Sequence, residues 1–534
     1  MREHDAVVVG SGINSLACAA LLARAGWDVC VLEREAELGG AVRTAELTRP
    51  GFLHDVFSAW HPLWVGGPAH AELGAELELH GLQYLNTECP TATAFPDGKA
   101  AFLSTDPEKN ATEHGDAWRE AMGTVAAQAE LVFGVLGTEL WSAAGAGLLV
   151  KAQRRLGRRG LLAFGGEVLQ SSRDWLESTF ESERVHGLLA PWVLHTGLGP
   201  DAATSGFMTR VIAFAIEAGG MPIPRGGGAR LVDALVRLIA ANGGRCETGR
   251  DVEGIAVSDG RATAVRVGDG EIITARRAVI CNVTPTQLYG RLLDDGSVPV
   301  RVAAAGKRFR YGRSEMQIHY ALSEPPRWNG DERLAQTAVV HVTPGLDGVS
   351  RAVNEAERGL LPAEATIVVG QPLTIDPSRA PEGTGMLWIQ LQELPWHIKG
   401  DARGDLDAGG TWTTDLRERY ADRIQARLAR HITNLESATL ERVVLSPADL
   451  QAANINLTQG DPYSGSLALD QNFLWRPFAR QPGHATPVAQ LFHIGASTWP
   501  GPGLGAGSGT LVAKALLKPS LARRVGTWLR PGAA

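Results

Sequence analysis

Two glycines and one acidic residue near the start of the chain have the spacing of a dinucleotide site. Gly10 and Gly12 follow the apolar run of residues 5–9, and Glu33 closes a second apolar run 23 residues after Gly10. Glycines at such a turn let the backbone approach a pyrophosphate, and a carboxylate at that distance accepts hydrogen bonds from ribose hydroxyls. Ser15 replaces the third glycine of the usual pattern and is small enough for close packing of a helix on a strand. The spacing therefore predicts a dinucleotide site.

A glycine-rich loop near the end of the chain has the composition of a second contact with the same ligand. Residues 501–509 hold five glycines and one proline, between an apolar run at 491–494 and an apolar helical pattern that extends to residue 517. Such a loop brings backbone N–H groups to the edge of a flat ligand, and the helix after it stabilises negative charge there. We expect the two glycine stretches to contact opposite ends of one dinucleotide.

The composition argues against several other kinds of site. The five cysteines form no CxxC pair, which argues against a dithiol centre and against a zinc site, and no metal ligands are predicted. The net charge of −7 makes nucleic acid an unexpected partner. The first strand begins directly after Met1–His4, and no apolar run has the length of a transmembrane helix. We therefore expect a cytoplasmic protein without a targeting segment.

Alternating strands and helices must hold the glycine turns in place. The first turn is expected between a strand at 5–9 and a helix at 14–25, with the next strand at 29–32. A second helix is predicted at 229–242. Further strands are predicted at 245–249, 252–257, 261–267, 271–275 and 277–281, with residues 268–270 as a hairpin turn. This pattern predicts an α/β, Rossmann-like nucleotide-binding domain.

The length of the chain indicates more than one domain. A chain of 534 residues exceeds the size at which a single core stops growing. Residues 61–220 have a mostly helical pattern, and residues 301–445 alternate strand-like runs with a long helix near 413–432. We predict a discontinuous nucleotide-binding domain made of residues 1–60, 221–300 and 446–534, and an inserted α+β substrate or cap domain made of residues 61–220 and 301–445.

Three stretches together resemble the FAD-binding segments of the phytoene desaturase-type flavoproteins. They are VVVGSGINSLACAALLARAGWDVCVLEREAELGG, PRGGGARLVDALVRLIAANGGRCETGRDVEGI and FHIGASTWPGPGLGAGSGTLVAKAL. That group includes carotenoid desaturases and isomerases, retinol saturases and the pyridine nucleotide-disulphide oxidoreductase domain-containing proteins, which the chain resembles most. NIN at 454–456 and DPYSG at 461–465 are also similar to the pattern of that last subgroup.

The resemblance implies a non-covalent FAD in a domain of the glutathione reductase/amine oxidase type. The residues that it implies for FAD binding are Gly10, Gly12, Ile13, Asn14, Glu33, Arg34, Gly40, Arg43, Val252, Gly495, Gly503 and Leu504. The chain departs from the GHNG motif of these relatives, since Ile13 and Ser15 stand where they have His and Gly. Any role of that histidine near the flavin is therefore absent here.

Four side chains are candidates for the substrate side of the flavin. Trp60 and His61 follow the segment expected beside the flavin, Trp499 lies in the C-terminal loop, and His195 follows Trp192 in the cap. For each histidine the alternative is a surface or core role, and for each tryptophan it is ordinary core packing. Because flavin N5 accepts a hydride with little help from protein acids and bases, these residues are expected mainly to orient substrate.

A second nucleotide-binding unit is not found in the sequence. GGGARL at 226–231 opens a helix, but PIPR before it has no strand pattern, so a dedicated site for NAD(P)H is not expected. The electrons would pass to oxygen, a quinone or another acceptor, or return to the product in an isomerisation.

The resemblance implies hydride transfer between flavin N5 and an apolar substrate, with desaturation, saturation or isomerisation of C=C bonds. One alternative is a flavin-dependent amine or C–N oxidase, although relatives of that kind often attach FAD through a cysteine and the C-terminal loop has none. A second alternative is a non-catalytic carrier on the same fold.

A basic stretch in the cap suggests a docking surface. Lys151, Arg154, Arg155, Arg158 and Arg159 have the spacing of one helical face, with apolar residues on both sides. The simpler interpretation is a solvated basic face. The alternative is peripheral contact with anionic lipid or with a partner.

Overall fold

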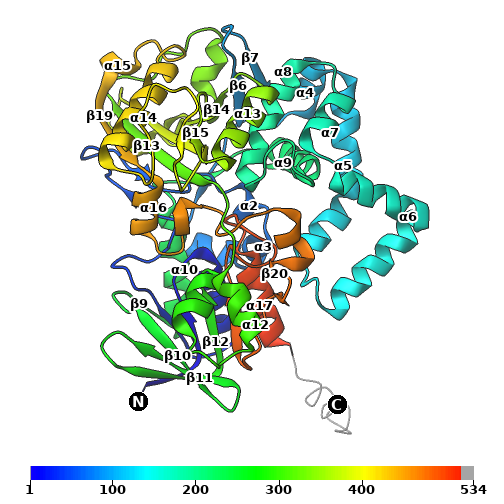
Figure 1. The fold of residues 1–534 in the computed structure, drawn as a ribbon, viewed down its shortest axis with the longest axis vertical. Coiled ribbons are helices and arrows are strands. Elements are labelled where there is room, and N and C mark those ends of the chain that lie inside the picture. Colours follow the sequence, from blue (N-terminus) through cyan, green and yellow to red (C-terminus); the bar gives the residue numbers. More distant parts are fainter. Residues whose placement is uncertain (1, 519–534) are drawn as a thin grey trace.

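The computed structural model describes residues 2–518 and contains two large sheets, one above the other (Figure 1). The lower sheet combines both ends and the middle of the chain. The upper sheet belongs to the segments between them, and a group of helices lies beside it. The elements of each sheet therefore fall within the two sets of residues that we predicted for the two domains. The domain limits themselves stay predictions, and residues 519–534 of the last segment lie outside the described part.

The lower sheet has the strand order β10-β11-β12-β1-β2-β9, with β22 also paired to β12. Strands β9, β2, β1, β12 and β22 are parallel, and β10 and β11 form an antiparallel ribbon with the start of β12. The bounds are β1 (Arg2–Val9), β2 (Val29–Leu32), β9 (Arg245–Glu247), β10 (Val252–Ser258), β11 (Arg261–Val267), β12 (Ile272–Asn282) and β22 (Leu491–Ile494). The predicted strands at 271–275 and 277–281 are thus one strand, β12.

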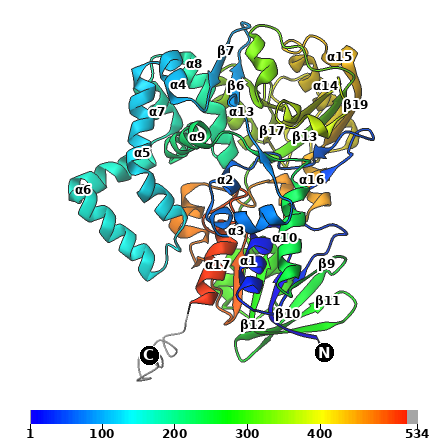
Figure 2. The same cartoon turned by 180° about the vertical axis from the view of Figure 1, so that it is seen from behind.

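Both sides of β1 are apolar, and each side lies in a hydrophobic core of its own. Ala6 and Val8 face the core formed with α1 (Ile13–Arg24), α10 (Ala229–Ala241) and α17 (Gly507–Leu517). Val7 and Val9 lie in a second core with β10, β11 and α12 (Val300–Lys307). Figure 2 shows α1 between α10 and α17, as their packing in the first of these cores requires.

The upper sheet has the order β19-β13-β17-β16-β14-β6-β7. Its strands are β6 (Thr91–Ala94), β7 (Ala100–Leu103), β13 (Ser314–Leu322), β14 (Val339–Val342), β16 (Ile367–Gly370), β17 (Gly385–Leu394) and β19 (Thr439–Leu445). The period of two along β17 sends Leu387, Ile389 and Leu391 into a core with α14 (Thr414–Leu428). The other face, which carries Trp388, looks toward the lower sheet and the helices.

The remaining helices mostly surround the upper sheet. The α-helices of seven or more residues among them are α3 (Pro68–Leu79), α4 (Pro107–His114), α5 (Asp116–Leu136), α6 (Ala143–Leu169), α7 (Ser172–Thr179), α8 (Glu183–Leu189), α9 (Ser205–Gly219), α13 (Leu346–Glu357) and α16 (Pro447–Ala453). Helices α5 and α6 project from one side of the molecule (Figures 1 and 2). No helix within residues 2–518 combines the length and the apolar content that crossing a membrane requires.

The structure corrects the prediction of one continuous basic face on α6. Gly157 has φ 69° and ψ 174°, so the helical path is broken there. Arg158 and Arg159 therefore do not extend the face that carries Lys151 and Arg155. Those two residues instead form ion pairs with Glu130 of α5, at 2.5 and 3.4 Å.

Candidate active site

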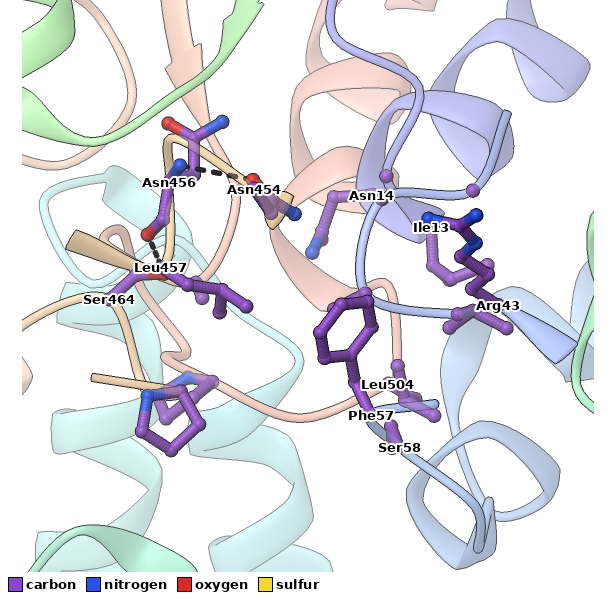
Figure 3. Close-up of a pocket in the computed structure, with 18 of the residues that line it drawn as sticks. Ile13, Asn14, Arg43, Phe57, Ser58, Asn454, Asn456, Leu457, Ser464 and Leu504 are labelled. Atoms are coloured by element: carbon purple, nitrogen blue, oxygen red, sulfur yellow. Dashed lines mark hydrogen bonds between the residues drawn. The ribbon is translucent and has the colours of Figure 1, made fainter. Parts of the chain in front are cut away.

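A cavity of about 540 Å³ lies between the two sheets. It begins at the carboxyl ends of β1, β2 and β12, where its lining includes Gly10, Glu33 and Asn282. Ligands of open parallel sheets bind outside these ends, where the strand order reverses. Figure 3 shows part of the lining, with Asn14 and Arg43 on one side of the cavity and Asn454 and Ser464 on the other.

The first turn has the shape of a cradle that only glycine allows. Gly10 has φ 84°, and a Cβ atom there would lie 3.1 Å from the backbone oxygen of Asn282. A Cβ on Gly12 would lie 2.9 Å from the Asn282 amide nitrogen, and one on Gly40 would lie 3.2 Å from the Gly12 Cα. Helix α1 begins at this turn without a side-chain cap, so its first N–H groups are available to an anion.

The carboxylate of Glu33 is fixed at the end of β2. It is almost fully buried and accepts hydrogen bonds from the Ser11 N–H (2.9 Å) and hydroxyl (2.6 Å) and from the Glu35 N–H (3.0 Å). An ionised carboxylate has about four acceptor positions, so it can take a further hydrogen bond. Glu33 thus holds the glycine turn in shape as well as lining the cavity.

The C-terminal loop is joined directly to the first turn. The Gly509 N–H donates to the Asn14 side chain at 3.1 Å, and the Gly495 N–H donates to the Ser508 hydroxyl at 3.0 Å. The start of α17 therefore lies against the start of α1. Of the residues predicted in this segment, Gly503 and Leu504 line the cavity. Gly495 does not, and its neighbours Ala496 and Ser497 take that place.

Eleven of the twelve predicted FAD residues line this single cavity, all but Gly495. Together these residues form a glycine cradle, a helix start without a side-chain cap, and a buried carboxylate acceptor at the end of the second strand. These features suit the pyrophosphate and adenosine of a dinucleotide. Which of them contacts the cofactor stays a prediction.

The part of the cavity against the upper sheet is mostly apolar. Its walls include Trp60, Trp192, Ile212, Ala215, Ile216, Met221, Val339, Val368 and Trp388. Of the predicted substrate-side residues, Trp60 and His195 lie here. His195 stacks on Trp192 with ring centroids 4.6 Å apart, and burial lowers its pKa to about 3.

A polar patch interrupts the apolar wall on strands β13 and β17. Gln390 is opposite Gln317 in the register of the two strands, and the period of two places Glu315 and Gln392 on the same face. Burial raises the pKa of the Glu315 carboxyl to about 8, with a smaller contribution from the charge of Asp461. Glu315 is therefore mostly neutral at pH 7. Glu315, Gln390 and Gln392 all line the cavity.

This polar patch was not among the sites that we predicted from the sequence. The sequence feature that could have indicated it is the alternation of polar and apolar residues along a strand, in E-x-Q-x-H at residues 315–319 and in W-x-Q-x-Q at residues 388–392. The DPYSG segment contributes to the same region. Asp461 accepts hydrogen bonds from the N–H groups of Gly312, Tyr463 and Gly465 at 2.7–2.8 Å, which places Tyr463 on the cavity wall.

His61 and Trp499 do not line the cavity, which corrects our prediction for both. His61 is fully buried behind the wall, where its Nδ1 lies 2.9 Å from the Tyr84 hydroxyl. The Trp499 indole N–H donates to the Thr138 carbonyl oxygen at 2.9 Å, so this ring anchors the link between α5 and α6. Both side chains therefore contribute to packing outside the cavity.

The second glycine turn, at 226–228, is filled by the chain's own carboxylates. The Gly226 N–H donates to Asp376 and the Gly228 N–H donates to Asp55, both at 2.7 Å. The two aspartates also pair with the fully buried Arg379, at 3.1 Å for Asp376 and 2.5 Å for Asp55. The start of α10 is thus capped from within, so these two N–H groups are already used and are not available to a second pyrophosphate.

The described part of the chain holds no candidate metal site. Within residues 2–518, no group of three or more His, Cys, Asp or Glu side chains is arranged to hold an ion. The five cysteines, all in the described part, are free thiols.

Comparison with known proteins identifies relatives over nearly the whole chain. A family model for flavin containing amine oxidoreductases matches residues 16–403. One component of the limonene dehydrogenase of Castellaniella defragrans is 25% identical over 96% of this chain and 94% of its own. The mouse pyridine nucleotide-disulfide oxidoreductase domain-containing protein 2 is 25% identical over 97% and 94%, and the zeta-carotene-forming phytoene desaturase of Myxococcus xanthus is 26% identical over 93% and 90%.

The fold is also similar to that of a solved amine oxidase. Cyclohexylamine oxidase from Brevibacterium oxydans aligns over 98% of this chain and 99% of its own, with a TM-score of 0.55 and 16% identity. At that identity the likeness concerns the fold alone.

Proposed function

Because the chain belongs to the flavin containing amine oxidoreductase family, we propose that it desaturates, saturates or isomerises C=C bonds of an apolar molecule. Membership of the family confirms the predicted Rossmann-like fold class and FAD as the cofactor. It also confirms the resemblance to phytoene desaturases and to the pyridine nucleotide-disulfide oxidoreductase domain-containing proteins. An FAD-dependent oxidoreductase is thus established, and its substrate and reaction are the subject of this proposal.

The observation that carries the proposal is the composition of the cavity against the upper sheet. Branched aliphatic side chains and three tryptophans form most of this wall. Such a surface binds hydrocarbon because it releases water from apolar area on both sides. The names of two relatives, limonene dehydrogenase and phytoene desaturase, point to substrates of the same character.

Bound FAD supplies the two-electron chemistry by accepting or returning a hydride. The chain's own residues bind, orient and exclude water. Helix α1 and the glycine cradle would hold the pyrophosphate, and Glu33 would accept a hydrogen bond from the ribose. Trp60, Trp192 and Trp388 hold the hydrocarbon and keep water away from it.

Amine oxidation is the second candidate, favoured by the solved amine oxidase with the same fold. The cavity residues argue against it. Within residues 2–518 the acidic residues that line the cavity are Glu33, Glu35, Glu37, Asp251 and Glu315. Only Glu315 belongs to the wall of the upper sheet, and burial favours its neutral form, which is a poor partner for an ammonium group.

The test compares substrates of the two kinds on the FAD-loaded enzyme. Limonene and phytoene in detergent micelles, and cyclohexylamine in buffer, would each be mixed with it anaerobically while the flavin absorbance is followed. We expect a hydrocarbon to bleach the flavin and to yield a product that lacks two hydrogen atoms, or an isomer without net bleaching. Bleaching by cyclohexylamine, with no change in either hydrocarbon, would overturn the proposal.

For re-oxidation we propose oxygen or a quinone, since the capped turn at 226–228 argues against a nicotinamide site. An anaerobic sample of reduced enzyme should be re-oxidised by a soluble quinone. Failure of both oxygen and quinones would refute this.

Peripheral contact with anionic lipid is likewise a proposal. It now rests on Arg154, Arg158 and Arg159 together with the exposed side chains of Leu149 and Leu162, which are 60% and 78% exposed. Co-sedimentation with phosphatidylglycerol vesicles, and not with phosphatidylcholine vesicles, would support it. Equal recovery in the supernatant with both would contradict it.

A further inference from the structure

The polar patch of β13 and β17 contains hydrogen-bonding atoms that no protein group satisfies. Within the described residues, the Glu315 Oε2 and Gln392 Oε1 atoms are buried and have no hydrogen-bond partner. Both side chains line the cavity and are at least 97% buried. A buried polar atom without a partner carries a desolvation cost, so it indicates a ligand that completes it.

The network around Gln392 fixes which of its atoms is left over. The Tyr463 hydroxyl gives its only proton to the Leu194 carbonyl oxygen at 2.8 Å, so it must accept from its other neighbour. That neighbour is the Gln392 nitrogen at 2.7 Å. The second N–H of the same amide points to His195 Nδ1 at 3.4 Å. The amide nitrogen is thus used within the protein, and the oxygen remains as an acceptor.

The same argument fixes the free atom of Glu315. The Gln317 amide nitrogen donates to the Phe57 carbonyl oxygen at 3.2 Å and to Glu315 Oε1. Because Oε1 accepts, a neutral Glu315 carries its proton on Oε2. Burial keeps this carboxyl neutral at pH 7, since its pKa is raised to about 8. The Gln390 amide donates toward this carboxyl and partly offsets the rise of its pKa. A donor of that kind cannot accept the proton on Oε2, so this proton stays without an acceptor among the described residues.

We propose that the substrate is an apolar molecule with one hydroxyl group, which accepts a hydrogen bond from Glu315 Oε2 and donates one to Gln392 Oε1. A hydroxyl is the small group that both donates and accepts. An ether or ketone oxygen would leave Gln392 without a donor, an ammonium would leave Glu315 without an acceptor, and a plain hydrocarbon would leave both unsatisfied. The inference rests on the proposed function and names the class of its substrate. The hydroxyl anchors one end of the molecule, while the apolar wall holds the remainder.

The test measures binding, so it does not depend on turnover. The FAD-loaded protein would be titrated with 1-octanol, with its isomer heptyl methyl ether, with octane and with octylamine, by calorimetry at pH 7. We expect 1-octanol to bind about tenfold more tightly than the ether, because the ether lacks the proton that Gln392 requires. This comparison uses the unaltered protein.

Two variants and one control locate the effect. In Gln392→Leu the preference for 1-octanol over the ether should fall to within about twofold, and in Glu315→Gln it should persist because the amide keeps a donor. Val368→Ala alters the apolar wall and should weaken both ligands equally, leaving their ratio unchanged. Retention of FAD by each variant reports that the fold is intact.

The outcomes separate this inference from the proposed function. Equal affinity for 1-octanol and the ether, with both bound, overturns the inference and leaves the proposed function standing. Tightest binding of octylamine overturns the inference and supports C–N oxidation. No binding of any of the four molecules to FAD-loaded protein overturns both.

Discussion

Replacing Glu315 by glutamine should make the protein more stable, and the gain should grow as the pH rises. The folded state keeps this carboxyl neutral with a pKa near 8, whereas the ordinary value is 4.5. Below pH 4.5 the group is protonated in both states, so it favours neither of them. Between pH 4.5 and 8 only the unfolded chain loses the proton, and the free energy of unfolding falls by about 1.4 kcal/mol for each pH unit.

The magnitude at neutral pH follows from the same numbers. From pH 4.5 to pH 7 the wild type loses about 3 kcal/mol through this one carboxyl. Glu315→Gln has no proton to lose, so its advantage over the wild type should increase across that range and level off above pH 8. Burial and the charge of Asp461, which raise the pKa of Glu315, are both unchanged in the variant. The pH dependence of the difference in stability between the two proteins therefore reports the titration of Glu315 alone.

The assay is urea unfolding of the FAD-saturated wild type and variant at each half pH unit from 5 to 9. Glu382→Gln, which removes a carboxylate from an exposed loop, gives the baseline for changing a charge by itself. Infrared spectroscopy should also show a protonated carboxyl band at pH 7 that loses intensity in Glu315→Gln, the remainder coming from Glu393, whose pKa burial raises to about 7. A stability difference that stays constant from pH 5 to 8, or an unchanged infrared band, would refute the reasoning.

Three further predictions concern FAD binding, the buried ion triad of Arg379 and the nicotinamide nucleotides. Glu33→Ala should weaken FAD binding about tenfold to a hundredfold, because charge-assisted hydrogen bonds are worth about 1.5–3 kcal/mol. Retention of FAD during dialysis measures this effect, and Glu33→Gln should lose less FAD than Glu33→Ala. Full retention of FAD by Glu33→Ala would contradict the prediction. Arg379→Met should cost about 3–5 kcal/mol in urea unfolding, since it leaves Asp55 and Asp376 buried without their cation; an unchanged midpoint would be evidence against a structural ion triad. NADH or NADPH at millimolar concentration should leave the flavin oxidised for many seconds in anaerobic stopped flow, and rapid bleaching at micromolar concentration would reveal a nicotinamide site that we have missed.

The nucleotide site could be predicted from the sequence because its signals are local. Gly10, Gly12 and Glu33 lie within one βαβ unit, so their spacing alone brings them to one end of two neighbouring strands. The C-terminal loop has a comparable local pattern. Eleven residues from these segments and from Val252 therefore meet in one cavity, as expected.

The substrate region could not be predicted because it depends on contacts between distant segments. Glu315, Gln390 and Tyr463 come together only through the register of β13 and β17 and through the loop that Asp461 holds. No local sequence pattern specifies that register. In the same way, nothing near His61 in the sequence predicts its contact with Tyr84. The helical spacing of the residues around Gly157 also gave no indication of the break in the helix there.

The strand order of the lower sheet also governs how the protein is made. β12 lies between β1 and β22, which are separated by almost the entire chain. At roughly 5–20 residues per second, the ribosome releases β22 on the order of 25–100 s after β1. Until then β12 lacks its neighbour β22, α1 lacks α17, and the cavity has no C-terminal loop. A nascent or truncated chain therefore has no complete site for its cofactor. Binding of FAD can stabilise the folded state only after synthesis is nearly finished.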